Sequence, residues 1–438
     1  MRSRRMSYSS GACLFAAMAR GLLHGYHASC LTGTLCKESP MEAAAPFRHR
    51  SFPLSIHAGK GSLDQLRGEV DRTKAKRAFV VCGKSVATRT DLVARVKDNL
   101  AEKFAGVFDG VATSSPLPSV HEGTAAARAA NADLIVAIGG GSAMVTARAI
   151  IILLAEKGDI HQICTQYPPG QAPVSPRLMA PKIPNILVLT TPSTAMTRAG
   201  TAVMDTETHH RLELFDPKTR PFAMIWDDDA LATAPADLYL STAASAFSGI
   251  LTGAAAPRTN PISHGDFLQG LRLSLESLPL IRTDPQNATA RMNLVAASFL
   301  SNRALDSMRG RAFGIISSLG HVVDTLYENV THGDAYSLTT AWGLRFNLEP
   351  TAAGLARLAQ GLGVGDGLSQ IDAARRAADF VEDFYRRLGM PVRLRDARIP
   401  QEDIGRIAHD AMGDFYLHQN ARKVKDESEL VDLLRQMW

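Results

Sequence analysis

Cysteines are scarce in this sequence, and long apolar runs are missing. The 438 residues include five cysteines, at positions 13, 30, 36, 82 and 164, and no two of them are spaced as C-x-x-C. This pattern excludes a disulfide framework or a zinc knot and is typical of a reducing compartment. No apolar run approaches the roughly 18 residues that a membrane span needs, so we expect no membrane partner.

The chain also has little net charge outside its first 40 residues. The formal net charge is +5 and the pI is about 9.0. Residues 1–40 contain five basic residues and one acid, which leaves +1 for the rest of the chain. Because this rest has no basic stripe, we expect no nucleic-acid partner. The 45% apolar and 21% charged residues are ordinary for a soluble globular protein and exclude disorder, collagen and coiled coil.

Residues 1–48 are interpreted as a tail that precedes the folded body. Arg and Ser are frequent in its first 40 residues, and no acid precedes Glu38, which is the composition of an organelle transit peptide. The alternative is a translation start at Met41, since globular patterning begins after that residue. We therefore expect a cytoplasmic protein, or an organelle protein if residues 1–40 are translated and direct import.

Short apolar runs alternate with amphipathic stretches from about residue 52. This alternation predicts a Rossmann-like α/β domain at 49–228 with a mostly parallel sheet, followed by an all-α domain at 229–438. Two extended runs around a polar turn at 205–208 predict a hairpin, and the proline-rich stretch 166–184 predicts a loop. The runs that predict buried strands are 77–82, 134–138, 186–190 and 222–226.

One strand runs directly into a glycine turn. Gly139, Gly140, Gly141 and Ser142 follow the apolar run 134–138, and a helical pattern begins after them. Glycines let backbone N–H groups approach a ligand, and a helix N-terminus carries partial positive charge, so a phosphate or pyrophosphate would be stabilised here. The alternative is a purely structural turn.

The order of segments around this turn resembles that of the iron-containing alcohol dehydrogenases. The N-terminal half carries AKRAFVVCGKS, VFDGV, ADLIVAIGGGSAMVTARAI, ILVLTTPSTAMTRAGTAVMD and MIWDDDALATAP, and the helical half carries NATARMNLVAASFLSNRAL, GHVVDTLYENVTHGDA and LGMPVRLRDARI. VFDGV and PLPSV are most similar to the maleylacetate reductase branch. The resemblance implies the fold shared with dehydroquinate synthase, a small-molecule substrate, and NADH or NADPH as cofactor. We also expect a homodimer.

The resemblance assigns cofactor contacts to seven residues, namely Gly139, Gly140, Gly141, Ser142, Thr190, Thr191 and Gly83. The glycines and serine would bind the pyrophosphate, and the two threonines would support the nicotinamide ribose. The family's loop reads GGGSxxDxxK, but here Val145 replaces the acid and Arg148 replaces the lysine. Many relatives place an Asp where Gly83 stands, and its loss removes repulsion against a 2′-phosphate, which favours NADPH or the use of both cofactors.

The metal ligands of the family are mostly absent. Their first two positions fall on Ser245 and Gly249, and the third falls on Ser317 or Ser318. Only His332 is retained. One imidazole without a partner thiolate or carboxylate binds a divalent cation poorly, since catalytic sites supply about three protein ligands. We therefore expect no bound metal.

Three catalytic residues are expected: His332, His321 and Arg198. The histidines would polarise a carbonyl and donate a proton, whereas Arg198, or alternatively Arg258, would bind a substrate carboxylate. Asp324 lies one helical turn after His321 and shares its face. The alternative for each is a structural role.

Two hypotheses of function follow. The first is an NAD(P)-dependent oxidoreductase that reduces a small carbonyl or an unsaturated oxo-acid, similar to maleylacetate reductase, without a metal. The second is a metal-free descendant of the fold with non-redox catalysis or ligand binding only. Both stay open at this point, because function resides in the site rather than in the fold.

Overall fold

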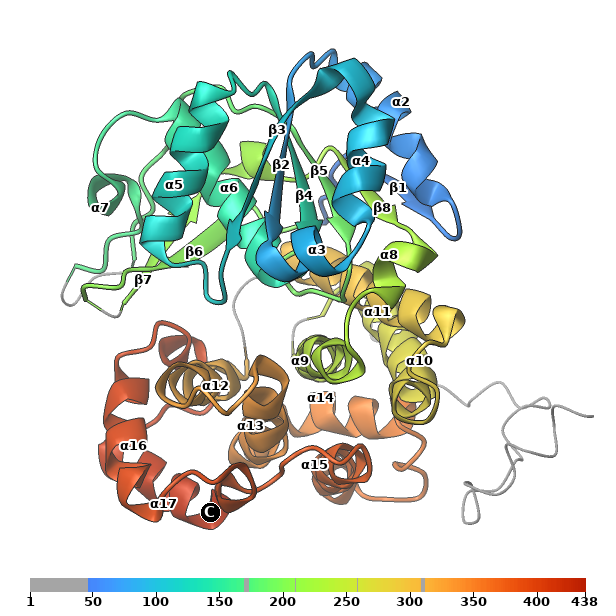
Figure 1. Ribbon diagram of the computed structural model, residues 1–438. Coiled ribbons are helices and arrows are strands. Elements are labelled where there is room, and N and C mark those ends of the chain that lie inside the picture. The colour runs from blue at the N-terminus through green and yellow to red at the C-terminus, as the bar shows by residue number, and fades with distance from the viewer. Residues whose placement is uncertain (1–45, 169–172, 209, 258, 309–311) are drawn as a thin grey trace, which may run out of the picture. The chain divides into compact units, whose positions relative to one another are not determined.

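The computed structural model describes residues 46–168, 173–208, 210–257, 259–308 and 312–438 (Figure 1). Arg48–Trp438 form one compact unit. Within this unit an α/β part is followed in sequence by a helical part. Of the predicted tail, residues 1–45 lie outside the described residues, as do three of the five cysteines. None of the helices in the described segments is both long and apolar enough to cross a membrane.

A six-stranded parallel sheet forms the centre of the α/β part (Figure 1). Its strand order is β1-β8-β5-β4-β2-β3. All four predicted strands are present, with ends within one residue of the expected positions. The six strands are β1 (Ser55–Ala58), β2 (Ala78–Gly83), β3 (Phe104–Val111), β4 (Leu134–Gly139), β5 (Asn185–Leu189) and β8 (Ala223–Trp226).

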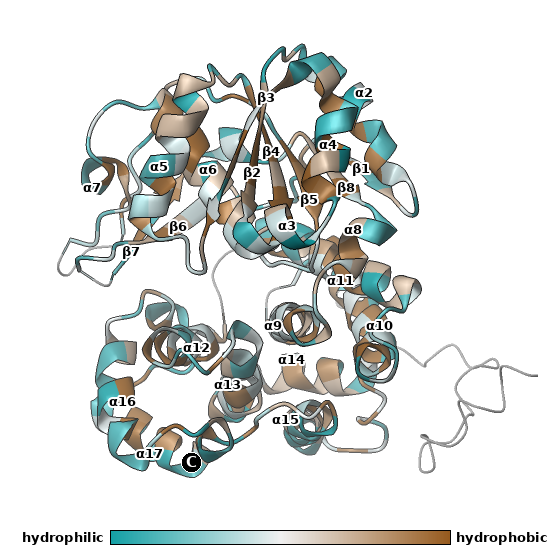
Figure 2. Ribbon diagram, viewed as in Figure 1, coloured by the Kyte–Doolittle hydropathy of each residue, from teal (hydrophilic) through white to brown (hydrophobic). Residues whose placement is uncertain are grey.

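Alternate residues of each inner strand are buried on opposite faces of the sheet. Val80 and Val136 pack with residues of α2 (Leu66–Thr73) and α4 (Leu92–Leu100). Phe79 and Ile135 belong to a different cluster, which includes residues of α5 (Leu117–Ala129) and α6 (Gly141–Ala155). Because helices cover both faces, these strands are apolar at nearly every position, with Asn185 of β5 an exception, and Figure 2 shows this hydrophobic centre in brown.

Smaller elements complete the α/β part. The predicted hairpin is confirmed as β6 (Gly200–Met204) and β7 (Arg211–Phe215), which pair antiparallel. Helices α3 (Lys84–Arg89) and α7 (Ile160–Ile163) are short, and three 3-10 turns lie at Ser62–Gln65, Ala101–Lys103 and Pro217–Thr219. The described residues of the predicted loop at 166–184 contain only an isolated bridge between Gln166 and Val174.

The helical part begins where Asp227 caps the short helix α8 (Asp228–Ala232) by accepting a hydrogen bond from the Ala230 N–H. Within the described residues no strand follows, as predicted. Three further 3-10 turns lie at Leu394–Ala397, Gln401–Asp403 and Leu417–Gln419. The long helices are α9 (Ala236–Ala254), α10 (Pro261–Thr283), α11 (Ala288–Asp306), α12 (Gly314–Leu326), α13 (His332–Phe346), α14 (Leu348–Gly361), α15 (Gln370–Arg387), α16 (Ile404–Met412) and α17 (Glu427–Met437).

The two parts share one hydrophobic cluster, which runs from the β4 and β5 side chains into α9, α11 and α12. Polar contacts also connect the α/β part to the helical part. Arg220 pairs with Asp306 on α11 at 2.7 Å, and the Asn302 amide donates to the Ser193 carbonyl at 3.2 Å. These contacts fix the segments after β5 and before β8 relative to α11.

Candidate active site

The glycine turn between β4 and α6 leaves no room for side chains. Gly139 has φ +144°, a conformation that L side chains rarely adopt, and a Cβ there would lie 3.0 Å from the Cβ of Ala143. A Cβ on Gly140 would lie 2.6 Å from Oγ1 of Thr191. No side chain caps the N-terminus of α6. Its first N–H groups therefore remain available to an anion.

The segment after β5 lies against this turn. The Thr190 N–H donates to the Gly139 carbonyl at 3.1 Å. Thr191 is 1% exposed, and its Oγ1 has no hydrogen-bond partner among the described residues. Since buried hydroxyls are normally satisfied, this atom indicates a missing polar partner. The orphan hydroxyl beside uncapped N–H groups fits the phosphate and ribose of a dinucleotide, although the roles of these residues stay a prediction.

Gly83 ends β2 and occupies the N-cap of α3. A Cβ at this position would lie 3.4 Å from the Val111 carbonyl, so a small side chain would be tight but not excluded. The neighbouring Lys84 pairs with Asp109 of β3 at 2.8 Å, which places one cation and one carboxylate beside Gly83. Sequence reasoning missed Asp109. Because both signs of charge are present, the loss of an Asp at Gly83 does not by itself favour NADPH.

Arg148 holds the loop after β5 through hydrogen bonds to its backbone. It is 1% exposed and donates to the carbonyls of Ala195 and, at 3.1 Å, of Gly200. Burial, aided by the nearby Arg198 and Arg220, lowers the pKa of Arg148 to about 9. Arg198, predicted to be catalytic, donates through Nε to the Thr194 carbonyl at 3.0 Å. Arg258, its alternative, lies outside the described residues.

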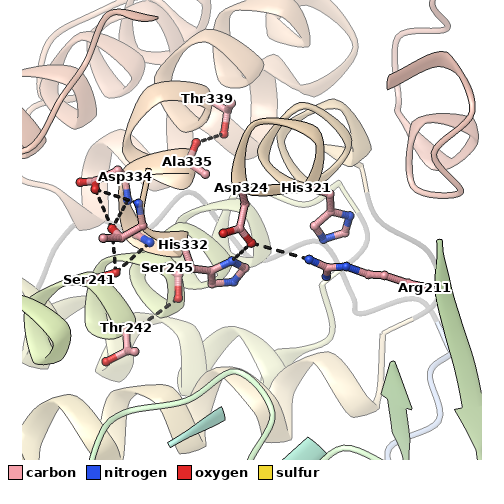
Figure 3. Close-up of polar contacts among 12 residues, drawn as sticks. Arg211, Ser241, Thr242, Ser245, His321, Asp324, His332, Asp334, Ala335 and Thr339 are labelled. Carbon is pink, nitrogen blue, oxygen red and sulfur yellow. Dashed lines mark hydrogen bonds and ion pairs between the residues drawn. The ribbon is translucent and has the colours of Figure 1, made fainter. Parts of the chain in front are cut away.

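His332 is the first residue of α13 and is held by a carboxylate. Its Nδ1 lies 2.9 Å from Oδ2 of Asp324 on α12 (Figure 3). Thr331 caps the helix in a reciprocal capping box with Asp334, which fixes the backbone at His332. The side chain is 39% exposed. Because Nδ1 is engaged by Asp324, the Nε2 atom is the one left for a ligand.

His321 forms a second histidine–carboxylate pair. Its Nδ1 lies 2.9 Å from Oδ2 of Asp414, and the ring of Tyr416 contacts it edge-on at 5.4 Å. Burial lowers the pKa of His321; Asp414 opposes this shift, and the nearby Arg211 and His332 add to it. The sequence suggested that Asp324 would accompany His321 on their shared helix, but its hydrogen bond goes to His332 instead.

Arg211 completes this group, which we call the histidine cluster: Arg211, His321, Asp324, His332 and Asp414. The Arg211 Nη2 lies 3.7 Å from Oδ2 of Asp324. Sequence reasoning missed Arg211 and Asp414, since β7 and the segment after α16 are far from α12 in the chain. No local motif marks either residue.

The residues that the resemblance assigns to the family's metal-ligand positions make other contacts in the structure. Ser245 Oγ donates to the Thr242 carbonyl at 2.9 Å, and Ser318 Oγ donates to the Ala411 carbonyl at 2.8 Å. Gly249 offers no side chain. In the described part of the chain, no group of three or more His, Cys, Asp or Glu side chains is arranged to hold a metal ion. This donor set does not fit a catalytic divalent cation, which needs about three protein ligands.

The α/β part with its glycine turn and the helical part with its two histidine–carboxylate pairs match the two domains of one enzyme family. The family model described as "Iron-containing alcohol dehydrogenase" matches residues 53–228. A second model, "Fe-containing alcohol dehydrogenase family, C-terminal", matches residues 246–438. The chain therefore belongs to the iron-containing alcohol dehydrogenase family, as the sequence predicted. Its relatives are oxidoreductases, and they include a maleylacetate reductase.

Three similar proteins illustrate the range of the family. The NAD-dependent methanol dehydrogenase of Bacillus methanolicus is 26% identical over 86% of this chain and 97% of its own length. Maleylacetate reductase 2 of Cupriavidus pinatubonensis is also 26% identical, over 71% of this chain and 77% of its own. The crystal structure of a 1,3-propanediol oxidoreductase, 24% identical, superposes with a TM-score of 0.80 and covers 90% of this chain and all of that one. Because the chain is equally identical to the methanol dehydrogenase and to the maleylacetate reductase, these identities do not indicate its substrate class.

Proposed function

We propose that this protein is an NAD(P)-dependent oxidoreductase that reduces a small carbonyl compound without a bound metal. The observation that supports this most directly is the His332–Asp324 pair. The resemblance assigns His332 to the one retained ligand position, and at the other positions Ser245, Gly249 and Ser317 or Ser318 supply neither an imidazole nor a carboxylate to a metal. An imidazole with its Nδ1 fixed by a carboxylate can perform the polarisation that a metal otherwise supplies.

The cofactor, when bound, supplies the hydride for the carbonyl carbon. Backbone N–H groups at Gly140–Ser142 bind the pyrophosphate through the α6 N-terminus, and Thr191 donates its free hydroxyl to the nucleotide. Nothing larger than glycine is accommodated at positions 139 and 140.

His332 acts on the other side of the reaction. In its protonated form Nδ1 donates to Asp324, and Nε2 directs its proton at the carbonyl oxygen. As the carbonyl carbon gains two electrons, the oxygen takes that proton and the neutral imidazole remains, so charge and atoms balance. Asp324 stabilises the imidazolium before transfer and fixes the ring orientation. His321 is buried with its pKa lowered, so it is neutral near pH 7. Its Nδ1 donates to Asp414, so its Nε2 carries no proton and accepts a hydrogen bond, and His321 does not serve as the acid.

The metal assignment is tested on purified protein by elemental analysis for iron and zinc before and after treatment with EDTA. We expect far less than one metal per chain and a kcat that changes less than about twofold. Close to one metal per chain, removed together with activity, would overturn the assignment.

The redox assignment is tested by titrating NADH and NADPH and following binding by fluorescence and thermal stabilisation. Oxidation of the bound cofactor is then followed with a panel of aldehydes and oxo-acids. A wild-type protein that binds neither cofactor at millimolar concentration would contradict the proposal and leave non-redox catalysis or simple ligand binding.

A further inference from the structure

Arg211 is placed where a reductase would recognise the charge of its substrate. It lies on the hairpin strand β7, and Figure 3 shows its side chain extending toward Asp324 and His321 of α12. One third of the side chain is exposed. A cation from the α/β part therefore reaches the two histidines of the helical part and stays accessible to a small molecule.

Within the described segments, the guanidinium of Arg211 makes only a loose ion pair, with Asp324. Its contact with Asp324 is 3.7 Å, beyond hydrogen-bond reach, whereas the same carboxylate oxygen lies 2.9 Å from His332. Among the described residues, this ion pair is the sole polar contact of the Arg211 side chain given by the structure. A guanidinium has five N–H donors, so most of them are available to a ligand.

Arginines with a structural role in this protein make closer contacts than Arg211 does. Arg220 binds both oxygens of Asp306, at 2.7 Å and 3.1 Å, and stacks on the Phe52 ring at 3.8 Å. Arg303 likewise donates to both oxygens of Asp266. Such two-point pairs use the planar fork fully. Arg211 has the fork but no protein carboxylate in it, which is the arrangement expected of an arginine that receives a ligand carboxylate.

Both Arg211 and His332 contact Oδ2 of Asp324. Nη2 of Arg211 and Nδ1 of His332 are therefore separated by no more than the sum of the 3.7 Å and 2.9 Å contacts, and Nε2 of His332 lies across the same imidazole ring. A molecule that meets both groups at once carries its anion only a few bonds from the carbonyl that His332 polarises. This spacing suits a short oxo-acid or semialdehyde acid.

We propose that Arg211 binds the carboxylate of the substrate, so that this enzyme acts on short oxo-acids rather than on neutral aldehydes or ketones. This inference rests on the function proposed above and names its substrate class. It offers Arg211 for the role that the sequence suggested for Arg198, whose Nε donates to the Thr194 carbonyl.

The test uses two substrates of equal carbon number, 4-oxobutanoate and butanal, with the wild type, Arg211→Gln and Arg211→Lys. We expect the wild type to prefer the acid. Arg211→Gln should lower kcat/KM for the acid about ten- to a hundredfold more than kcat/KM for butanal, mainly through KM, because only the acid loses a charged partner. Arg211→Lys should recover part of the loss, since it keeps the charge but not the fork.

Arg67→Gln is the matched control, because Arg67 belongs to an exposed pair with Glu102 in the α/β part. It should change neither substrate's kinetics. If Arg211→Gln lowers kcat/KM for both substrates alike, Arg211 is structural and the inference is wrong. A wild type that does not prefer the acid contradicts it as well.

Calorimetric binding of 4-oxobutanoate separates this inference from the proposed function. If the wild type binds the acid, Arg211→Gln does not, and neither cofactor supports turnover, then the anion site stands and the reductase proposal fails. Turnover of butanal without binding of the acid sustains the reductase and removes the anion site. With neither binding nor turnover, both are wrong.

Discussion

In the proposed function, the glycine turn and the histidine cluster recognise their ligands by different means. The turn presents backbone N–H groups from one short segment, and its specificity lies in the absence of side chains at Gly139 and Gly140. The histidine cluster presents side chains from β7, α12, α13 and the segment after α16, and its specificity lies in which carboxylate meets which imidazole. Shape should therefore dominate mutational effects at the turn, and charge and orientation should dominate at the cluster.

The largest expected effect is at the turn. Gly140→Asp places a Cβ 2.6 Å from Oγ1 of Thr191 and a carboxylate against the pyrophosphate. A charge left without compensation typically costs about 3–5 kcal/mol, so cofactor affinity should fall at least about a hundredfold and activity should disappear. Fluorescence titration with NADH and NADPH measures this loss.

Gly68→Asp in α2 is the control for that substitution, since a Cβ at Gly68 meets nothing within 4 Å. It should leave cofactor affinity unchanged. Equal affinity for cofactor in Gly140→Asp and Gly68→Asp would show that the nucleotide binds elsewhere, and the two regions would no longer be distinguished by shape.

The next effect is at the cluster. His332→Ala removes the group that polarises the carbonyl, so kcat should fall by roughly 10²–10⁴-fold, which is typical of general acid catalysis. The cofactor dissociation constant should hardly change, because the turn is intact. His409→Ala provides a control, since His409 is exposed and pairs with Glu427 on the surface. Wild-type turnover in His332→Ala would assign the proton donor to another residue, with His321 next in line.

The two regions also differ in how well the sequence predicts them. Gly139–Ser142 was predicted because it is contiguous and directly follows an apolar strand, whereas Thr190 and Thr191 were predicted through their family positions. His332 and His321 were found through their family positions. Arg211 and Asp414 were not, because their roles arise only when a hairpin and the segment after α16 approach α12. Side-chain partners of this kind depend on tertiary packing and leave no local pattern.

Asp324→Asn asks which histidine carries the proton. The amide keeps the size of Asp324 but cannot stabilise an imidazolium at His332, so kcat should fall about ten- to a hundredfold while cofactor affinity stays constant. Asp414→Asn makes the same change beside His321 and should have the smaller effect on kcat. If the order is reversed, His321 is the acid and His332 the supporting residue. Steady-state kinetics with saturating cofactor distinguishes the two outcomes.

The smallest expected effect concerns the pH dependence of stability. Burial lowers the pKa of His321 in the folded state below its value of about 6.5 in the unfolded chain. The unfolded state therefore binds more protons between these two pKa values, and the free energy of unfolding should decrease as pH falls below about 6.5. Asp324 does not titrate in this pH range. Burial opposes its ionisation, but His332 and Arg211 outweigh burial, so the pKa of Asp324 is lowered from 3.8.

One titrating group contributes at most about 1.4 kcal/mol per pH unit to this slope. Urea unfolding at pH 7.5, 6.5 and 5.5 measures it for the wild type, and His321→Gln should reduce the slope because the titrating group is gone. His409→Gln, an exchange at an exposed surface pair, should keep the wild-type slope. A slope that His321→Gln leaves unchanged would place the buried titrating group elsewhere, with His264 the first candidate, because burial also lowers its pKa.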